Sequence, residues 1–140
     1  MRIRVQIIQH ICECLVDLHD SGYVHRDLKP GNIMWLPSQN RWTLIDFGCA
    51  VRIGEQARMG FSLMYAAPEV LRACYREGQK AVMAAPALDV GSLGIIAVEL
   101  FSGGPAFGAF TTAEQVRKHI SCSETPSCAH YRYTYPPCLF

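Results

Sequence analysis

The 140-residue chain lacks an excess of charge of either sign, and it lacks a long apolar run. Its 13 Lys and Arg nearly balance 12 Asp and Glu, so charge gives no reason to expect nucleic acid or an anionic membrane as a partner. No stretch approaches the roughly 20 apolar residues that a membrane-spanning helix needs. Gln9, His10 and Glu13 interrupt any apolar core of a signal peptide. We therefore expect a globular chain without a membrane segment, in the cytoplasm by default.

Paired metal-binding cysteines are also missing, although the chain contains 7 Cys. No CxxC pair occurs, and without a secretory signal we expect all seven to be free thiols. The alternative is a zinc site near the C-terminus, where the candidate ligands match no usual zinc spacing. Those candidates are His119, Cys122, Cys128, His130 and Cys138.

Hydrophobic periodicity predicts a mainly α (α+β) fold. Apolar residues recur at three- and four-residue steps over 2–19, and Gly22 is suited to end that helix. Further helices are predicted near 69–73, over 89–101 and near 112–120. The helix over 89–101 is apolar almost all round, which favours a buried central position.

The rest of the chain shows weaker patterns. Two short strand-like runs, 33–36 and 42–45, flank a turn-rich segment and predict a β-hairpin. Residues 49–66 are predicted to be a long irregular connection. Beyond Ser121 no periodicity remains, so residues 121–140 are predicted to form a divergent, poorly ordered tail.

The densest group of chemically useful side chains lies in the segment HRDLKPGN, residues 25–32. Within six residues, Asp27 supplies a carboxylate that can act as a base, Lys29 a cation, and Asn32 an amide that can bind a metal. A carboxylate and an amide oxygen are hard ligands of the kind that Mg²⁺ prefers. This segment is therefore the first candidate for a site.

Further motifs follow in order along the chain. DFG occupies 46–48, directly after the predicted hairpin; APE occupies 67–69; Asp89 begins the predicted central helix. HRDLKPGN, a hairpin, DFG and APE in this order resemble the eukaryotic protein kinase family, and the Lys two residues after Asp27 resembles its serine/threonine branch. The resemblance implies a kinase C-terminal (catalytic) lobe whose hairpin carries the DFG motif, with residues 1–120 as a partial kinase domain.

The resemblance also implies a reaction, the transfer of the γ-phosphate of ATP to a Ser or Thr hydroxyl of a protein substrate. Asp27 matches the base that accepts the hydroxyl proton, and Lys29 matches the cation beside the transferring phosphate. Asn32 and Asp46 match the ligands of Mg²⁺. Met34 matches the floor beneath the adenine ring.

Other positions match residues that shape the family's site. Arg26 matches the Arg that clamps the activation segment, while Ser62 and Tyr65 fall in the loop that docks the substrate. Ser62 stands where the serine/threonine branch keeps a hydroxyl facing the catalytic Asp. The structural matches are His25 and Phe47 of the hydrophobic spine, Gly48, which lets the backbone aim Asp46, Glu69 of APE, and Asp89, which anchors the backbone of the catalytic loop.

The 140 residues also depart from the family's pattern. They contain no GxGxxG, and none of the three lysines stands in a V-A-I-K context. We therefore expect the chain to lack the N-lobe and to be inactive by itself, and the alternative function is a non-catalytic remnant or interaction module. Gly91 stands where the family usually has Trp. By analogy with Trp→Ala in a core, this difference would lower the packing contribution to stability by roughly 3–5 kcal/mol.

The segment between Cys49 and Phe61 contains no Ser, Thr or Tyr. In the family, a phosphate on this segment pairs with the Arg of HRD and orders the loop. A phosphorylation switch is therefore not expected in this segment. Glu55 could replace the phosphate as an anion opposite Arg26, and the alternative is a solvated Glu55.

Overall fold

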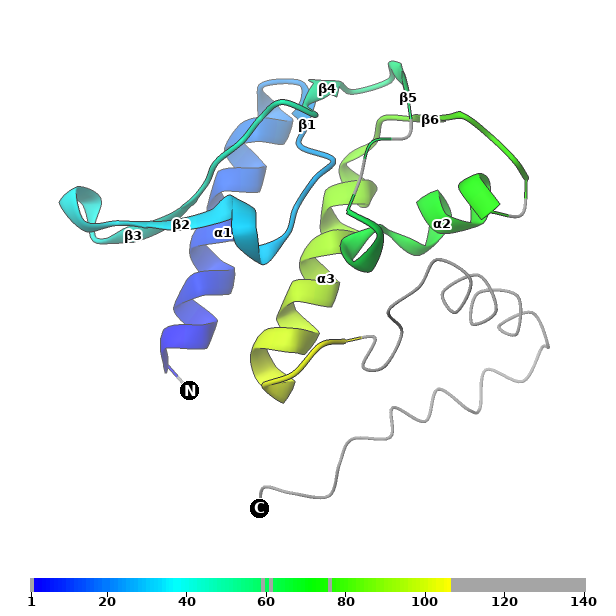
Figure 1. The fold of residues 1–140 in the computed structure, drawn as a ribbon. Helices are drawn as coiled ribbons and strands as arrows, with labels where there is room; N and C mark the ends of the chain where they lie inside the picture. Colours follow the sequence, from blue (N-terminus) through cyan, green and yellow to red (C-terminus); the bar gives the residue numbers. More distant parts are fainter. Residues whose placement is uncertain (1, 59, 61, 76, 107–140) are drawn as a thin grey trace.

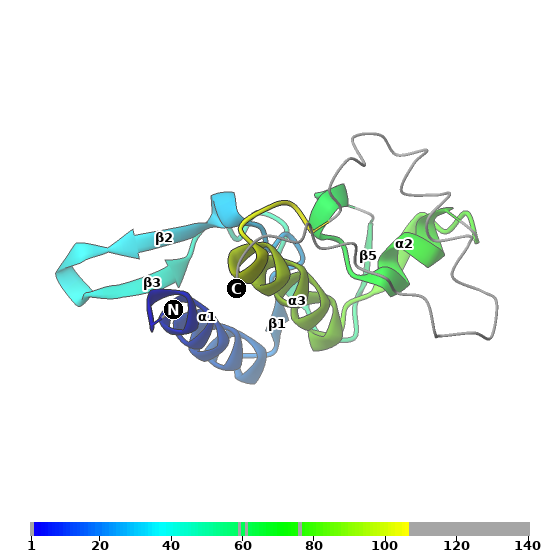
Figure 2. The same cartoon turned by 90° about the horizontal axis from the view of Figure 1, so that it is seen from below.

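Two long helices, α1 (Arg2–Asp20) and α3 (Pro86–Ser102), lie side by side in the molecule (Figures 1 and 2). The computed structural model describes residues 2–58, 60, 62–75 and 77–106. Within these residues, a shorter helix, α2 (Pro68–Tyr75), contacts α3, and the strands form three two-stranded sheets. The described part is thus mainly helical with small sheets, as predicted.

Helix α1 forms because its apolar side chains repeat with the helical period. Ile11 and Leu15 are buried in a cluster with side chains from β3 (Arg41–Leu44) and α3. The helix is followed by Gly22, whose φ is +85° and whose N–H donates to the carbonyl of His19 at 2.9 Å. The predicted helix over 2–19 and its glycine stop are confirmed.

The predicted hairpin is present. Strand β2 (Ile33–Leu36) pairs antiparallel with β3, which begins one residue earlier than predicted and ends at Leu44. A short 3₁₀ turn, η2 (Pro37–Gln39), joins the two strands. The hairpin extends to one side of α1 (Figure 2), and its inner end leads back to the segment that contains Asp46.

The prediction of an irregular connection over 49–66 is wrong. Strand β4 (Val51–Arg52) pairs antiparallel with β1 (Tyr23–Val24), and β5 (Gln56–Arg58) pairs antiparallel with β6 (Ala81–Met83). A 3₁₀ turn, η3 (Leu63–Tyr65), follows. These strands have only two or three residues, too few to show an alternation of polar and apolar side chains, and their partners lie far away along the chain.

Helix α3 begins at Pro86, earlier than predicted, because proline suits the first position of a helix, where its missing N–H is not needed. It ends before Gly103, whose φ is +79° and whose N–H donates to the carbonyl of Glu99 at 2.9 Å. The predicted central position is confirmed, since both buried clusters include residues of α3, but the helix is not buried all round, because Val90 is 60% exposed and Phe101 is 46% exposed. An apolar composition permits burial but does not require it.

Two clusters of buried apolar side chains share α3. Leu88 belongs to the cluster that joins α3 to α2 and β1, whereas Leu93 and Ile96 belong to the cluster that joins α3 to α1 and β3. Because Leu28 is buried in the second cluster, the loop over 25–32 is fixed to the core from within.

None of the described helices is long and apolar enough to cross a membrane. The helix predicted near 112–120 and the tail predicted over 121–140 lie outside the described residues.

Candidate active site

The loop between β1 and β2, residues 25–32, is anchored by a buried carboxylate. Asp89 is 0% exposed, and its two oxygens accept the backbone N–H groups of His25 and Arg26, each at 2.8 Å. Arg26 has a φ of +71°, a left-handed conformation that costs a non-glycine residue about 1–3 kcal/mol. The two hydrogen bonds offset this cost, so Asp89 fixes the backbone directly before Asp27.

His19 also contacts the anchoring carboxylate, and sequence reasoning missed it. Its Nε2 lies 2.9 Å from Oδ2 of Asp89, which joins the last turn of α1 to α3. A signal was present in the sequence, because His19 lies four residues after Leu15, on the apolar stripe of α1. A polar side chain on a buried stripe needs a hydrogen-bond partner.

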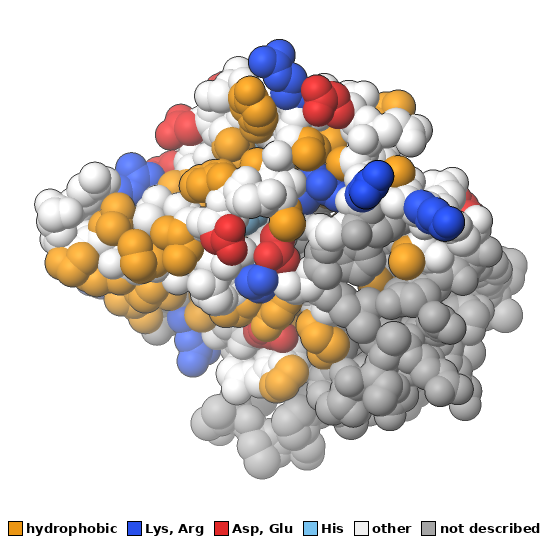
Figure 3. All heavy atoms as spheres, turned by 45° about the horizontal axis from the view of Figure 1, so that its top comes forward, with side chains coloured by type: hydrophobic (Ala, Val, Ile, Leu, Met, Phe, Trp, Pro, Cys, Tyr) orange, Lys and Arg blue, Asp and Glu red, His pale blue; other side chains and the backbone are white. Residues whose placement is uncertain are grey.

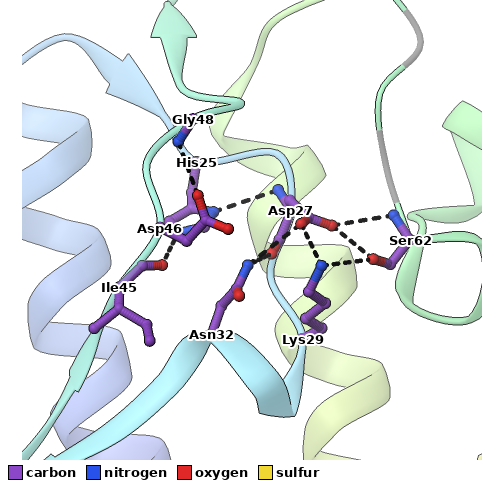
Figure 4. A network of polar contacts seen from close by, with 8 residues as sticks. All are labelled: His25, Asp27, Lys29, Asn32, Ile45, Asp46, Gly48 and Ser62. Carbon is purple, nitrogen blue, oxygen red and sulfur yellow. Dashed lines mark hydrogen bonds and ion pairs between the residues drawn. The ribbon is translucent and has the colours of Figure 1, made fainter.

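Asp27 lies at the centre of a network that joins two distant segments of the chain (Figure 4). Its Oδ2 accepts hydrogen bonds from Nζ of Lys29 at 2.6 Å and from Nδ2 of Asn32 at 3.3 Å. Its Oδ1 accepts the backbone N–H of Ser62 at 3.1 Å and the hydroxyl of Ser62 at 2.8 Å. Nζ of Lys29 also donates to the hydroxyl oxygen of Ser62 at 3.2 Å. Four hydrogen bonds from three residues therefore hold the carboxylate in one orientation.

The network controls the charge of its two ionisable members. Burial raises the pKa of Asp27, but hydrogen bonds from Lys29 and Ser62 outweigh burial, so the pKa lies below the ordinary 3.8. The hydrogen bond to Asp27 is the main cause that raises the pKa of Lys29 above 10.5, and the charge of Asp46 adds to the effect. At neutral pH, Asp27 is therefore a carboxylate that can accept a proton, and Lys29 is a cation beside it.

Asn32 and Asp46 each carry a side-chain oxygen that a hard cation could bind, and Figure 4 draws both beside Asp27; Asn32 is buried, whereas Asp46 is exposed. The amide nitrogen of Asn32 donates to the backbone carbonyl of Asp27 at 2.8 Å and to its side chain, and the amide oxygen accepts no hydrogen bond from a described residue. In Figure 4, Asp46 lies on the opposite side of Asp27 from Ser62. The face drawn in Figure 3 shows acidic and basic side chains close together near its centre. A carboxylate and an amide oxygen fit the ligand preference of Mg²⁺.

The conformation of the DFG segment differs from the one expected. Asp46 itself has a φ of +62°, whereas Gly48 is not in the left-handed region. The N–H of Gly48 donates to Oδ1 of Asp46 at 3.3 Å, and a Cβ atom built on Gly48 would lie 3.2 Å from the same oxygen. Gly48 therefore leaves room for the carboxylate, and the strained backbone that aims it belongs to Asp46.

Arg26 holds the segment after DFG through backbone carbonyls. Its guanidinium donates to the carbonyl oxygen of Cys49 at 3.2 Å and to that of Arg58. Glu55 is exposed, and its side chain makes no contact with Arg26 among the hydrogen bonds and ion pairs of the described residues. The solvated Glu55 that was kept as the alternative is the arrangement found.

His25 and Phe47 contact each other, with ring centroids 5.1 Å apart. Nδ1 of His25 accepts the N–H of Asp27 at 3.3 Å, and its Nε2 lies 3.2 Å from the carbonyl oxygen of Ile45, so these partners assign the proton to Nε2. Phe47 is 50% exposed, and Met34 on β2 is 43% exposed. Both apolar side chains therefore face outward from the part of the chain that the structure describes.

Tyr65 and Glu69 have different surroundings in the loop and helix after Ser62. The hydroxyl of Tyr65 donates to Oε2 of Glu99 on α3 at 2.9 Å. Burial, with this hydrogen bond as the second cause, raises the pKa of Tyr65 to about 12. Glu99 was missed in the sequence because its partner lies on another element. Glu69 lies exposed in the first turn of α2 and forms no ion pair with a described residue.

The described cysteines, Cys12, Cys14, Cys49 and Cys74, are free thiols. Among the described residues, no group of three or more His, Cys, Asp or Glu could hold a metal ion. The five candidate zinc ligands near the C-terminus, and the other three cysteines, lie outside the described residues.

Comparisons with known proteins identify relatives of the chain. A family model described as protein kinase domain matches residues 2–137. The serine/threonine-protein kinase Kist of Mus musculus is 41% identical over 105 residues, which cover 69% of this chain and 25% of Kist. The SNF-related serine/threonine-protein kinase of Rattus norvegicus is 32% identical over 135 residues, which cover 94% of this chain and 15% of the relative.

A third relative comes from a different organism. The probable serine/threonine-protein kinase glkA of Dictyostelium discoideum is 30% identical over 125 residues, which cover 86% of this chain and 24% of the relative. The chain therefore spans a quarter or less of the length of these relatives.

Proposed function

Because the chain belongs to the protein kinase family, we propose that the protein is a serine/threonine kinase in which Asp27 is the catalytic base. One observation carries the proposal. Oδ1 of Asp27 accepts the hydroxyl of Ser62 at 2.8 Å, a distance suited to proton transfer from an aliphatic hydroxyl. A substrate Ser or Thr hydroxyl presents the same chemical group. When its oxygen forms a bond to the γ-phosphorus, the bond to the β-phosphate oxygen breaks, and the hydroxyl proton passes to Asp27.

Lys29 is the second catalytic residue. It is charged at neutral pH, and its Nζ lies 3.2 Å from the hydroxyl oxygen of Ser62. A phosphoryl group that reacts with a hydroxyl beside Asp27 is therefore within reach of this cation, which stabilises the negative charge of the transferring group. Arg26 acts by holding the segment that contains Cys49 and Arg58.

Asn32 and Asp46 are the proposed ligands of Mg²⁺. When bound, the ion supplies positive charge that neutralises the phosphates of ATP. Asn32 is oriented for this role because its amide nitrogen is already bonded to Asp27, which leaves the amide oxygen as the free end. Met34 supplies an exposed apolar side chain for the adenine ring.

The substrate loop, residues 62–67, receives the protein substrate. Its first residue, Ser62, bonds to Asp27 and Lys29, and Tyr65 bonds to α3. The loop thereby places the incoming chain next to the base. Lys29 and Ser62 both contact Asp27 and both match the serine/threonine branch of the family, which supports Ser and Thr as acceptors.

The 140 residues are not expected to transfer phosphate by themselves, because they contain no glycine-rich phosphate loop and no V-A-I-K lysine. Asn32 is buried, but Asp46 and Met34 are exposed, and solvent weakens the electrostatic interactions of an exposed carboxylate such as Asp46. If the isolated chain transfers no phosphate, the alternative is a non-catalytic remnant or an interaction module.

The test is a phosphorylation assay with the longest natural form of the protein that contains these residues. Labelled ATP is supplied with a mixture of peptides whose single acceptor is Ser, Thr or Tyr. We expect transfer to Ser and Thr peptides that depends on Mg²⁺. Transfer to Tyr peptides alone, or no transfer to any peptide, would contradict the proposal.

A further inference from the structure

Gly91 is the place where α3 meets the end of the substrate loop. A Cβ atom built on Gly91 would lie 2.7 Å from Cβ of Ala67, 3.3 Å from its Cα and 3.7 Å from Cδ of Pro68. Cβ contacts under 3.0 Å essentially never occur, so Ala67 could not keep its place beside a larger residue. The space next to position 91, where the family usually has Trp, is thus occupied by Ala67 and Pro68. This close approach offsets part of the packing loss expected from the sequence.

The substrate loop is held at three points. Ser62, its first residue, bonds to the catalytic loop, and Tyr65 bonds to Glu99. Its last residue, Ala67, is buried against Gly91. Between the first two points the chain forms the η3 turn, in which the N–H of Tyr65 donates to the carbonyl of Ser62 at 2.9 Å. A displacement of Ala67 is therefore expected to move Ser62 as well, because the few residues between them form a hydrogen-bonded turn.

The direction of that path is also constrained. Ala67 accepts the N–H groups of Val70 and Leu71 with its carbonyl, at 3.0 and 3.2 Å, so it is tied to the first turn of α2. Val70 and Leu71 are buried in the same cluster as Ala67. Moving Ala67 away from α3 without moving the packed start of α2 shifts the strain toward the other end of the loop, at Ser62.

We propose that Gly91 is a positioning residue for phosphoryl transfer. Because Gly91 has no side chain, the substrate loop packs closely on α3, and this packing fixes the position of Ser62 beside Asp27. Relaxing the contact from 2.7 Å to an ordinary 3.4 Å requires a shift of about 0.7 Å in Ala67 or in the helix. A misplacement of about 1 Å far from the reacting atoms can lower a rate by about 100-fold. The inference rests on the proposed function, because the packing of the substrate loop on α3 can affect transfer only if Asp27 is the base.

The chain contains a matched control on the same helix. Gly94 lies three residues after Gly91 in α3, is exposed, and has no heavy atom within 4 Å of its built Cβ. Gly→Ala at either position gives the same gain in helix propensity. The two variants therefore differ in whether the new methyl group meets Ala67.

The first readout does not depend on kinase activity. Amide NMR of the 140-residue chain follows the N–H of Ser62, which donates to Asp27 at 3.1 Å. Gly91→Ala is expected to shift the Ser62 resonance and to speed its hydrogen exchange, whereas Gly94→Ala leaves both at the wild-type values. An unchanged Ser62 resonance in Gly91→Ala, or an equal change in Gly94→Ala, overturns the inference.

If Gly91→Ala does not fold, a second substitution decides. Adding Ala67→Gly removes the 2.7 Å contact and leaves a nearest approach of 3.3 Å. The double variant is expected to fold and to restore the Ser62 resonance. A double variant without this recovery overturns the inference, because the clash with Ala67 is then not the cause.

The second readout uses the longest natural form of the protein. We expect kcat for a Ser peptide to fall roughly 10-fold in Gly91→Ala, with KM for Mg-ATP unchanged, and to stay at the wild-type value in Gly94→Ala. Absence of transfer in the wild-type protein would overturn the proposed function alone. The Ser62 resonance would still show whether Gly91 controls the position of the substrate loop. A wild-type kcat in Gly91→Ala would overturn the positioning role while leaving the proposed function intact.

Discussion

Replacing Asp89 with Asn changes the side chain that holds the loop over 25–32, while the size of that side chain stays nearly the same. In the wild-type chain, one carboxylate oxygen accepts the N–H of Arg26, and the other accepts the N–H of His25 and contacts His19. Asn offers one carbonyl oxygen and one NH₂ group instead. At least one buried N–H of the loop then faces another donor, and Arg26 keeps its left-handed backbone with less support.

The magnitude follows from these contacts. A hydrogen bond to a charged group contributes about 1.5–3 kcal/mol, and a buried donor left without a partner costs about 1–3 kcal/mol. Together they lower the free energy of unfolding by about 2.5–6 kcal/mol, which is a large share of the roughly 5–15 kcal/mol of a whole domain. For a chain of this size, the Tm is expected to fall by at least about 10 °C.

The assay combines thermal unfolding of the 140-residue chain with amide hydrogen exchange. We expect Asp89→Asn to lower the Tm and to reduce protection at His25 and Arg26 more than in the hairpin. Asp17→Asn is the control, because Asp17 is exposed on α1 and its carboxylate accepts no hydrogen bond from a described residue. If Asp89→Asn unfolds within a degree or two of the control, the carboxylate does not anchor the loop and the reasoning fails.

Three further outcomes are expected. The protonated phenol of Tyr65 donates a hydrogen bond to Glu99, and the pKa of Tyr65 is raised to about 12. This contribution to stability is therefore present below pH 10 and is lost as the pH rises from 10 toward 12. Tyr65→Phe should flatten this part of a plot of Tm against pH. Phosphatase treatment of the longest natural form should leave its kinase activity unchanged, because residues 49–61 have no hydroxyl side chain and Arg26 already donates to backbone carbonyls. A large loss of activity traced to residues 49–61 would contradict this prediction. Calorimetry should find that the 140-residue chain binds Mg-ATP with a Kd of about 1 mM or weaker, a binding free energy of about −4 kcal/mol at best. Micromolar binding that Asp46→Asn abolishes would contradict this prediction, because these residues would then bind Mg-ATP without a glycine-rich loop.

The helices and the hairpin could be predicted because their signals are local. The stripe that contains Ile11 and Leu15 repeats within one helix, and the two runs of the hairpin are separated by a short turn. The pairing of β5 with β6 could not be predicted, because it joins distant segments through three residues each. The exposure of Val90 could not be predicted either, since it depends on which segments cover α3.

For the candidate site, sequence order revealed more than composition. Asp27, Lys29 and Asn32 lie within six residues, so their proximity is a local property of one loop. Ser62 was placed beside Asp27 only through the family resemblance, and their hydrogen bond agrees with that expectation. The contact between Gly91 and the substrate loop could not be seen in the sequence, because it arises from a missing side chain.

Contacts between elements account for the other residues that were missed. His19 and Glu99 each bond to a partner on a different element, Asp89 and Tyr65 respectively. Periodicity can mark such positions as unusual, but it does not name the partner. The left-handed backbone of Asp46 was missed for a related reason, because the neighbouring glycine was the expected place for it.

The most direct test of the proposed function separates chemistry from binding in one variant. Asp27→Asn keeps the size of the side chain and removes the basic carboxylate, while Asn32 and Asp46 remain as ligands. Peptide phosphorylation and Mg-ATP affinity are measured on the same preparation of the longest natural form. The account predicts that transfer falls by at least about 100-fold while the Kd for Mg-ATP stays at the wild-type value. Transfer at the wild-type rate in Asp27→Asn would contradict the assignment of Asp27 as the base.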